Sequence, residues 1–229
     1  MAVIHRTTLS PGKLELLVAW LPSQPWYGPA AGHPELARAG GFRLDDPDGE
    51  VGIEFVVVTD GSRDGTAYLT PLTYRGSPLA GAEAGLIRTA EHGVLGRRWI
   101  YDGVRDPVLV AQLVALIQGG AQAQAQSVSN TADPTVTGRP AAPGALVPLT
   151  SAVTGSGASG TELRIATVDP DGLSGGQLAV VLTRVLQATA GADPAEPGVS
   201  ATWLQPDGQQ ARGVFATARY VPDRAASAS

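Results

Sequence analysis

The sequence predicts an α+β protein in which an antiparallel sheet packs against helices. The segment 41–74 alternates β-branched and aromatic residues with turn sequences such as Asp46-Pro47-Asp48-Gly49. Two other segments, which begin near Ser10 and Asp106, repeat apolar residues at intervals of three and four. We therefore expect an antiparallel meander accompanied by amphipathic helices.

The first half begins with a strand and a helix. Residues 2–9 are rich in β-branched side chains and are expected to be extended. Ser10 is a favourable N-cap and Pro11 a favourable first helical residue, so a helix is expected from Ser10 until Pro22 ends it. After a loop at 23–40, the strands of the meander are expected near 41–44, 51–59 and 66–74.

The rest of the first half leads to a second helix. A short helical turn around 83–86, followed by a loop, is expected before a strand at 97–101. Asp106 is an N-cap candidate and Pro107 stands at the first helical position, which predicts a helix that ends at Gly119.

The second half follows a change in composition. Residues 121–160 are rich in Gly, Pro, Ala and Ser, which predicts a linker, although part of it could lie as a surface strand. Beyond it we expect a strand at 161–168, a helix at 174–190 and a final hairpin. The predicted domains are 1–120, 121–160 as linker, 161–222 as a second α+β unit, and a flexible tail at 223–229.

The two halves share an order of elements that ends in strand, Pro-Asp-Gly turn and strand. The turns are Pro47-Asp48-Gly49 and Pro206-Asp207-Gly208. Two interpretations stay open. Such turns are common, so any two α+β halves look alike. Alternatively the unit is duplicated, and each half then wraps its sheet around one helix.

Composition excludes several classes of function. The chain has 229 residues, a formal net charge of -5 and no cysteine, so it forms no disulfide or thiolate metal site. It lacks a dense Lys/Arg run, which argues against a nucleic-acid partner. No signal peptide or membrane-spanning apolar run is visible, so we expect a cytoplasmic protein that does not bind a membrane.

The sequence Leu173-Ser174-Gly175-Gly176-Gln177 resembles the signature loop of ABC-type ATPases. Such a loop needs a phosphate-binding loop elsewhere, but the only lysine, Lys13, has Thr7 where that loop requires glycine. No histidine is followed two residues later by aspartate, as a kinase catalytic loop requires. We therefore interpret Ser174 and Gln177 as a helix capping box and expect no nucleotide cofactor.

Two other catalytic patterns are incomplete. Gly172-Leu173-Ser174-Gly175-Gly176 matches a nucleophile elbow, but the hydrolase order needs a later histidine and the last one is His92. His5, His33 and His92 do not stand at the spacing of helical metal ligands, so no metal is expected.

Aromatic and basic residues form the candidate binding surface. It consists of Trp26, Tyr27, Arg97, Arg98, Trp99 and Tyr101. As packing residues, the aromatics would lie at the edge of a core. As binding residues, they would stack on a sugar ring or anchor a partner protein.

Two segments carry a family resemblance. "AWLPSQPWYG" at 19–28 resembles the Trp-Leu-Pro-x-Gln-Arg-Trp-aromatic segment of actinobacterial maltokinases, with Pro25 where the family usually has arginine. "YDGVRDPVLVAQLVALI" at 101–117 is similar to the helix that closes their N-terminal cap domain. The resemblance covers residues 1–120 and implies a cystatin-like fold, in which an antiparallel sheet curls around a helix. The kinase lobes that would follow have no counterpart here.

These observations lead to three functional hypotheses. The first is a non-catalytic interaction or regulatory protein of α-glucan, maltose or trehalose metabolism, which binds a protein partner or a second copy of itself. The second is a module that binds α-glucan or maltose through exposed aromatics. The third is an enzyme of unrecognised type that acts on α-glucans.

Overall fold

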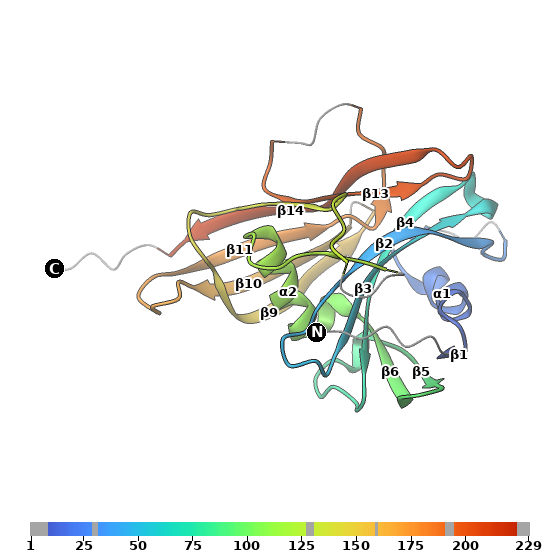
Figure 1. Cartoon of the computed structure of the whole chain (residues 1–229), viewed down its shortest axis with the longest axis horizontal. Coiled ribbons are helices and arrows are strands. Elements are labelled where there is room, and N and C mark those ends of the chain that lie inside the picture. Colours follow the sequence, from blue (N-terminus) through green and yellow to red (C-terminus); the bar gives the residue numbers. More distant parts are fainter. Residues whose placement is uncertain (1–8, 29–31, 127–130, 159, 191–194, 224–229) are drawn as a thin grey trace.

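The computed structural model describes residues 9–28, 32–126, 131–158, 160–190 and 195–223. Within these residues one antiparallel sheet has the strand order β1-β5-β6-β4-β3-β2-β13-β14-β11-β10-β9, while β12, β7 and β8 pair with β4, β2 and β13 (Figure 1). The strands are β1 (Leu9–Ser10), β2 (Leu36–Leu44), β3 (Gly52–Asp60), β4 (Thr66–Arg75), β5 (Leu86–His92), β6 (Gly96–Asp102), β7 (Gln124–Ala125), β8 (Thr137–Arg139), β9 (Val147–Gly157), β10 (Gly160–Val168), β11 (Gly175–Leu182), β12 (Val185–Leu186), β13 (Gly198–Leu204) and β14 (Gln210–Pro222).

The described residues contain two α-helices, both in the first half. The helix α2 (Pro107–Ile117) begins as predicted, because the Asp106 carboxylate accepts a hydrogen bond of 3.0 Å from the Val108 amide. The helix α1 (Lys13–Trp20) begins later than predicted, since Gly12 is its N-cap and Ser10 belongs to β1. The strand predicted at 2–9 lies almost entirely outside the described residues.

The α+β prediction is wrong, because the sheet dominates the fold and does not curl around a helix in the cystatin-like manner. The helix predicted at 174–190 is instead the strands β11 and β12. Its apolar residues fit a helical spacing of three and four. However, Leu178, Val180 and Leu182 also alternate at two-residue spacing, and these three are fully buried. Valine favours strands, and Gly175 and Gly176 disfavour a first helical turn.

The turn before β11 replaces the predicted capping box. The Asp169 carboxylate accepts hydrogen bonds from the amides of Leu173 (2.8 Å) and Ser174 (3.1 Å), which closes the turn between β10 and β11. Ser174 therefore precedes a strand, so its interpretation as a helix cap is wrong. The duplication hypothesis also fails, because the described part of the second half has no helix to pack across its strands.

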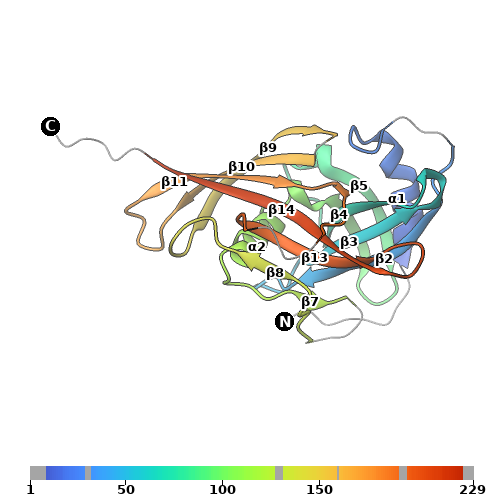
Figure 2. The ribbon, with the colours of Figure 1, turned by 90° about the horizontal axis from the view of Figure 1, so that it is seen from above.

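In the meander, β3 and β4 match their predicted positions, whereas β2 begins at Leu36, inside the loop predicted at 23–40. The strands β10, β13 and β14 also lie where strands were expected. A further strand, β5, occupies most of the loop predicted after Glu83. Residues 121–160, expected as a linker, contain β7, β8 and the eleven-residue strand β9. Figure 2 shows β9 beside β10, at the end of the sheet order.

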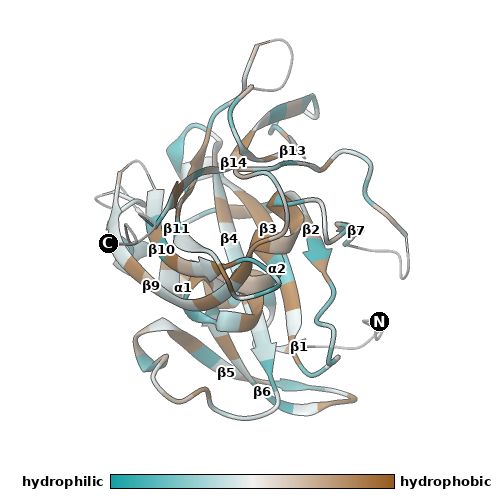
Figure 3. Cartoon of the chain, turned by 90° about the vertical axis from the view of Figure 1, so that its left-hand side faces the viewer, coloured by the Kyte–Doolittle hydropathy of each residue, from teal (hydrophilic) through white to brown (hydrophobic). Residues whose placement is uncertain are grey.

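Two buried clusters lie on the two faces of β3. One packs α2 against side chains from both halves, three phenylalanines among them. The centre of the Phe42 ring lies 4.6 Å from that of Phe55 and 6.0 Å from that of Phe215, and both pairs are stacked. The other lies under α1 and includes Leu17 and Val58. Figure 3 shows hydrophobic residues gathered in the interior around β2, β3 and α2. Both predicted units therefore contribute side chains to one core.

Two junctions connect the halves within the sheet. Gly40 of β2 pairs with Trp203 of β13 next to a β-bulge in β2. Gly41 follows with φ of 118°, and a Cβ there would lie 1.9 Å from the Phe55 carbonyl oxygen, so only glycine fits this approach. At the second junction, β12 pairs with β4. In the described part of the chain, neither helix is long and apolar enough to cross a membrane.

Candidate functional site

The aromatic residues of the predicted binding surface are mostly buried. Trp26, Tyr27 and Tyr101 are exposed by only 4%, 3% and 2%. Trp26 makes an edge contact with Trp20 at 5.8 Å, and the Tyr101 hydroxyl accepts a hydrogen bond of 2.8 Å from the Leu79 amide. These three side chains pack the fold, so they do not form an exposed platform on which a sugar ring could stack.

The remaining predicted residues lie on the β5–β6 hairpin. Arg97 is exposed and its Nε lies 3.0 Å from the Glu91 carboxylate, whereas Arg98 donates a hydrogen bond of 2.8 Å to the Leu95 carbonyl. Trp99 is half-buried. Val94 and Leu95 at the tip are exposed by 62% and 45%. The structure therefore buries three of the six predicted residues, and leaves Arg97, Arg98 and Trp99 more accessible on β6.

Tyr27 belongs to a buried polar cluster that the sequence analysis missed. Its hydroxyl donates to the fully buried Asp60 carboxylate, which also accepts hydrogen bonds from the Ser62 hydroxyl (2.7 Å) and the Glu35 amide (2.9 Å). The Arg63 guanidinium lies 4.1 Å from the centre of the Tyr27 ring. Of its members, the sequence had marked only Tyr27, as a candidate binding residue.

Hydrogen bonding decides the charge state of Asp60. Burial by itself raises the pKa of its carboxyl group, but the hydrogen bonds from Tyr27, Ser62 and the Glu35 amide outweigh burial and lower that pKa below its ordinary value. Burial, followed by the bond to Asp60, raises the pKa of Tyr27. The Asp60 carboxylate thus accepts hydrogen bonds from several groups, and the one from Tyr27 holds the loop that contains Tyr27 in place.

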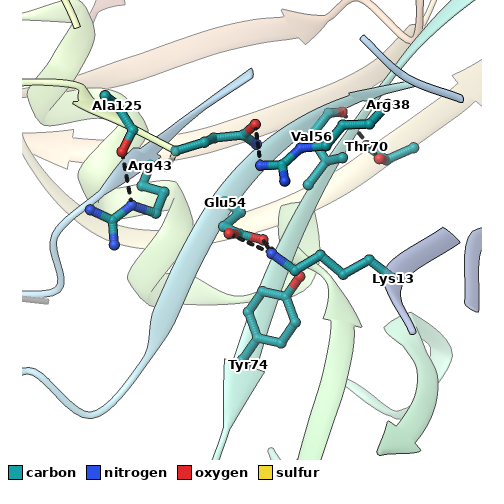
Figure 4. Close-up of polar contacts among 9 residues, drawn as sticks. Lys13, Arg38, Arg43, Glu54, Val56, Thr70, Tyr74 and Ala125 are labelled. Carbon is teal, nitrogen blue, oxygen red and sulfur yellow. Dashed lines mark hydrogen bonds and ion pairs between the residues drawn. The ribbon is translucent and has the colours of Figure 1, made fainter. Parts of the chain in front are cut away.

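The lone lysine has a structural partner. Lys13 Nζ lies 2.7 and 2.6 Å from the two carboxylate oxygens of Glu54, and the Tyr74 hydroxyl donates to the same carboxylate at 2.8 Å (Figure 4). Burial, and then the Glu54 charge, raise the pKa of Tyr74 well above its ordinary value. Lys13 therefore attaches the first turn of α1 to β3, and Glu54 neutralises its charge.

Two arginines on β2 hold the segment that follows α2. Arg43 Nε donates to the Ala125 carbonyl at 3.3 Å, and Arg38 Nη2 donates to Gln126 Oε1 at 2.7 Å. Figure 4 shows the Arg43 guanidinium beside Ala125 and the Arg38 guanidinium apart from it, above Glu54, so the two groups do not converge on a common point. We find no ligand-binding geometry in this group.

Arg184 connects the two halves in the interior. It is fully buried between β11 and β12, and its Nη2 lies 2.6 and 2.9 Å from the Asp102 carboxylate oxygens of β6. Its Nε donates to Thr161 Oγ1 at 2.8 Å, and its guanidinium lies 5.0 Å from the centre of the Trp26 ring. No sequence pattern marks this arginine, because its partners are distant in the chain.

One family model matches part of the chain. Residues 20–106 match the maltokinase N-terminal cap domain, which confirms the predicted resemblance for this part of the chain. The match contains α1's last residue, β2 to β6 and the turn before α2. A search of curated proteins gave no match. The match covers less than half of the chain, so it shows a likeness of this segment to the cap domain.

Proposed function

We propose that this protein is a non-catalytic interaction or regulatory protein of α-glucan, maltose or trehalose metabolism, and that it acts in the cytoplasm. The observation that carries the proposal is the cap-domain match at residues 20–106 in a sequence without a phosphate-binding lysine loop or a kinase catalytic loop. As the resemblance implies, the cap domain of a maltokinase is separate from its phosphoryl-transfer lobes, so a likeness to the cap domain supports a role in binding.

The contact surface in this proposal is the tip of the β5–β6 hairpin, which lies inside the matched segment. Val94 and Leu95 expose apolar surface there, and Arg97, Arg98 and Trp99 follow on β6. Trp and Arg are the residue types that most often dominate binding energy at protein interfaces. A partner that covers this tip would remove the exposed apolar side chains from water, which favours association.

The glycan-binding alternative receives less support. Its stacking platform consisted of Trp26, Tyr27, Trp99 and Tyr101, and three of these side chains are buried in the fold. For this reason the proposal places a protein, either an enzyme of the same metabolism or a second copy of the chain, on the hairpin.

The experiment compares three forms of the tagged protein by chemical cross-linking in native lysate and mass spectrometry. The forms are wild type, the hairpin variant Val94→Asp/Leu95→Asp, and the control Leu173→Asp, which alters a side chain exposed by 86% on the distant β10–β11 turn. We expect reproducible cross-links from the hairpin to one partner, and a loss of about tenfold or more only in the hairpin variant. A protein that remains monomeric and yields no reproducible partner would contradict the proposal.

A further inference from the structure

One face of the second-half strands is not covered by other elements of the described chain. Along β10 the burial alternates, with Leu163 and Ile165 facing the core and Arg164 between them exposed. On β11 the buried residues Leu178 and Val180 alternate with the less buried Ala179 and Val181. The outward residues of β10, β11 and β14 therefore form an open sheet face.

This face contains two adjoining hollows. The smaller, of about 510 Å³, is lined by Arg164, Ala179, Val181 and Arg219, among others. The larger, of about 620 Å³, lies over β8, β13 and β14 and includes Thr137 and Arg139. Glu196, Pro197 and Thr217 line both hollows. Both volumes lie in the range of small-molecule sites.

Strand register places two arginines in one row across the smaller hollow. Arg164 pairs with Ala179 on β11, and Ala179 pairs with Arg219 on β14. The two arginine Cα atoms are therefore two strand spacings apart, about 10 Å, and both side chains leave the same face. Ala179 between them is too small to fill the space, so both guanidinium groups have room to turn toward one anion.

The arginines around the two hollows have no polar partner among the described residues, and the same is true of Arg88 and Arg105 elsewhere. Arg139, Arg164 and Arg219 make no hydrogen bond or ion pair with any residue in the described ranges, whereas Arg75, Arg97 and Arg184 each contact a carboxylate. The chain has a formal net charge of -5, so unpaired acidic groups are more abundant than unpaired basic ones. Three partnerless arginines around two adjoining hollows thus form a local positive site in an acidic protein.

We propose that this face binds a small phosphate ester that also carries hydroxyl groups. The phosphate lies over Ala179, between Arg164 and Arg219. Phosphate fits this pair better than a carboxylate does, because its three oxygens can accept hydrogen bonds from both guanidinium groups, whereas a single arginine satisfies a carboxylate. The hydroxylated remainder lies in the larger hollow, where Thr137, Arg139 and Glu196 offer donors and acceptors. The proposal is independent of the partner contact at the β5–β6 hairpin.

Glu196 makes the site selective. Glu196 lines both hollows, so in this proposal its carboxylate repels a second negative group and accepts hydrogen bonds from ligand hydroxyls. The ligand should therefore have one phosphate at one end and an uncharged remainder. Replacing Glu196 by glutamine removes the repulsion, so it should strengthen the binding of inorganic phosphate.

The test is isothermal titration calorimetry at low salt with glucose 6-phosphate, inorganic phosphate and glucose. The proteins are wild type, Arg164→Ala/Arg219→Ala, Glu196→Gln, and the charge-matched control Arg88→Ala/Arg105→Ala, which alters two exposed arginines elsewhere. We expect wild type and control to bind glucose 6-phosphate more tightly than inorganic phosphate and not to bind glucose. The Arg164/Arg219 variant should lose about tenfold or more in affinity.

Several outcomes would overturn the proposal. The site is wrong if wild type gives no saturable heat with either phosphate at millimolar concentration, or if the two double variants lose affinity equally. Equal affinity for glucose 6-phosphate and inorganic phosphate would refute the role of the larger hollow, and unchanged phosphate affinity in Glu196→Gln would refute the role of Glu196. Circular dichroism should show the same thermal midpoint for all four proteins, since every altered residue is exposed.

Discussion

The strands β3, β10 and β11 belong to one sheet, but β3 is covered on both faces and β10 and β11 are not. From Ile53 to Asp60 every residue of β3 is buried, because α1 and its loop cover one face and α2 the other. Along β10 and β11 buried residues alternate with more exposed ones. The sequences reflect this difference: "IEFVVV" is almost continuously apolar, whereas "TELRIATV" alternates. The first region is therefore covered on both faces, whereas the second has one face that the described residues leave more exposed.

The largest effect should come from the contact that joins the two regions. Arg184→Ala leaves the Asp102 carboxylate without its buried partner, so we expect a loss of about 3–5 kcal/mol in the free energy of unfolding. The matched control is Arg97→Ala, whose pair with Glu91 is exposed by 63% and 62%, and which should cost about 0–1 kcal/mol.

Urea unfolding followed by tryptophan fluorescence measures both changes. If Arg184→Ala and Arg97→Ala shift the unfolding midpoint by similar amounts, the two regions are not held together by Arg184.

A smaller effect on the free energy of unfolding should distinguish β3, which is covered on both faces, from β11, which has one open face. Val57 on β3 is fully buried, so Val57→Ala should cost about 1–3 kcal/mol in the free energy of unfolding. Val181 on β11 points to the open face and is only half-buried, so Val181→Ala should change that free energy by less than about 0.5 kcal/mol. Equal costs in urea unfolding would show that the outer face of β11 is covered in solution.

Sequence reasoning succeeded where local patterns agree with each other. The meander at β2–β4 has turn residues and β-branched residues together, and α2 has Asp106, Pro107 and a leucine repeat together. It failed at 174–190, where one set of apolar residues fits both a helical and a strand period. Tertiary pairing with β10 and β14 decided in favour of the strand, and no local signal contains that information.

The candidate site was harder to predict than the fold. Trp26 and Tyr101 were candidates because exposed aromatic residues often bind ligands. Both are buried instead, through α1 and through contacts distant in the sequence, which their local sequence does not reveal. Arg164 and Arg219 are separated by 55 positions (219 − 164) and meet only through the register of β11 with its two neighbours. Strand register of this kind cannot be read from either segment alone.

The central claim is that the protein acts by binding and does not transfer a phosphoryl group. The direct measurement is release of ADP from Mg·ATP, in the presence and absence of maltose, by wild type and by the Arg164→Ala/Arg219→Ala variant. We predict no maltose-dependent ADP formation from either protein, because Lys13 is held by Glu54 and no phosphate-binding loop is present. Sustained, maltose-dependent ADP formation by wild type, whether or not the variant shares it, would contradict the account.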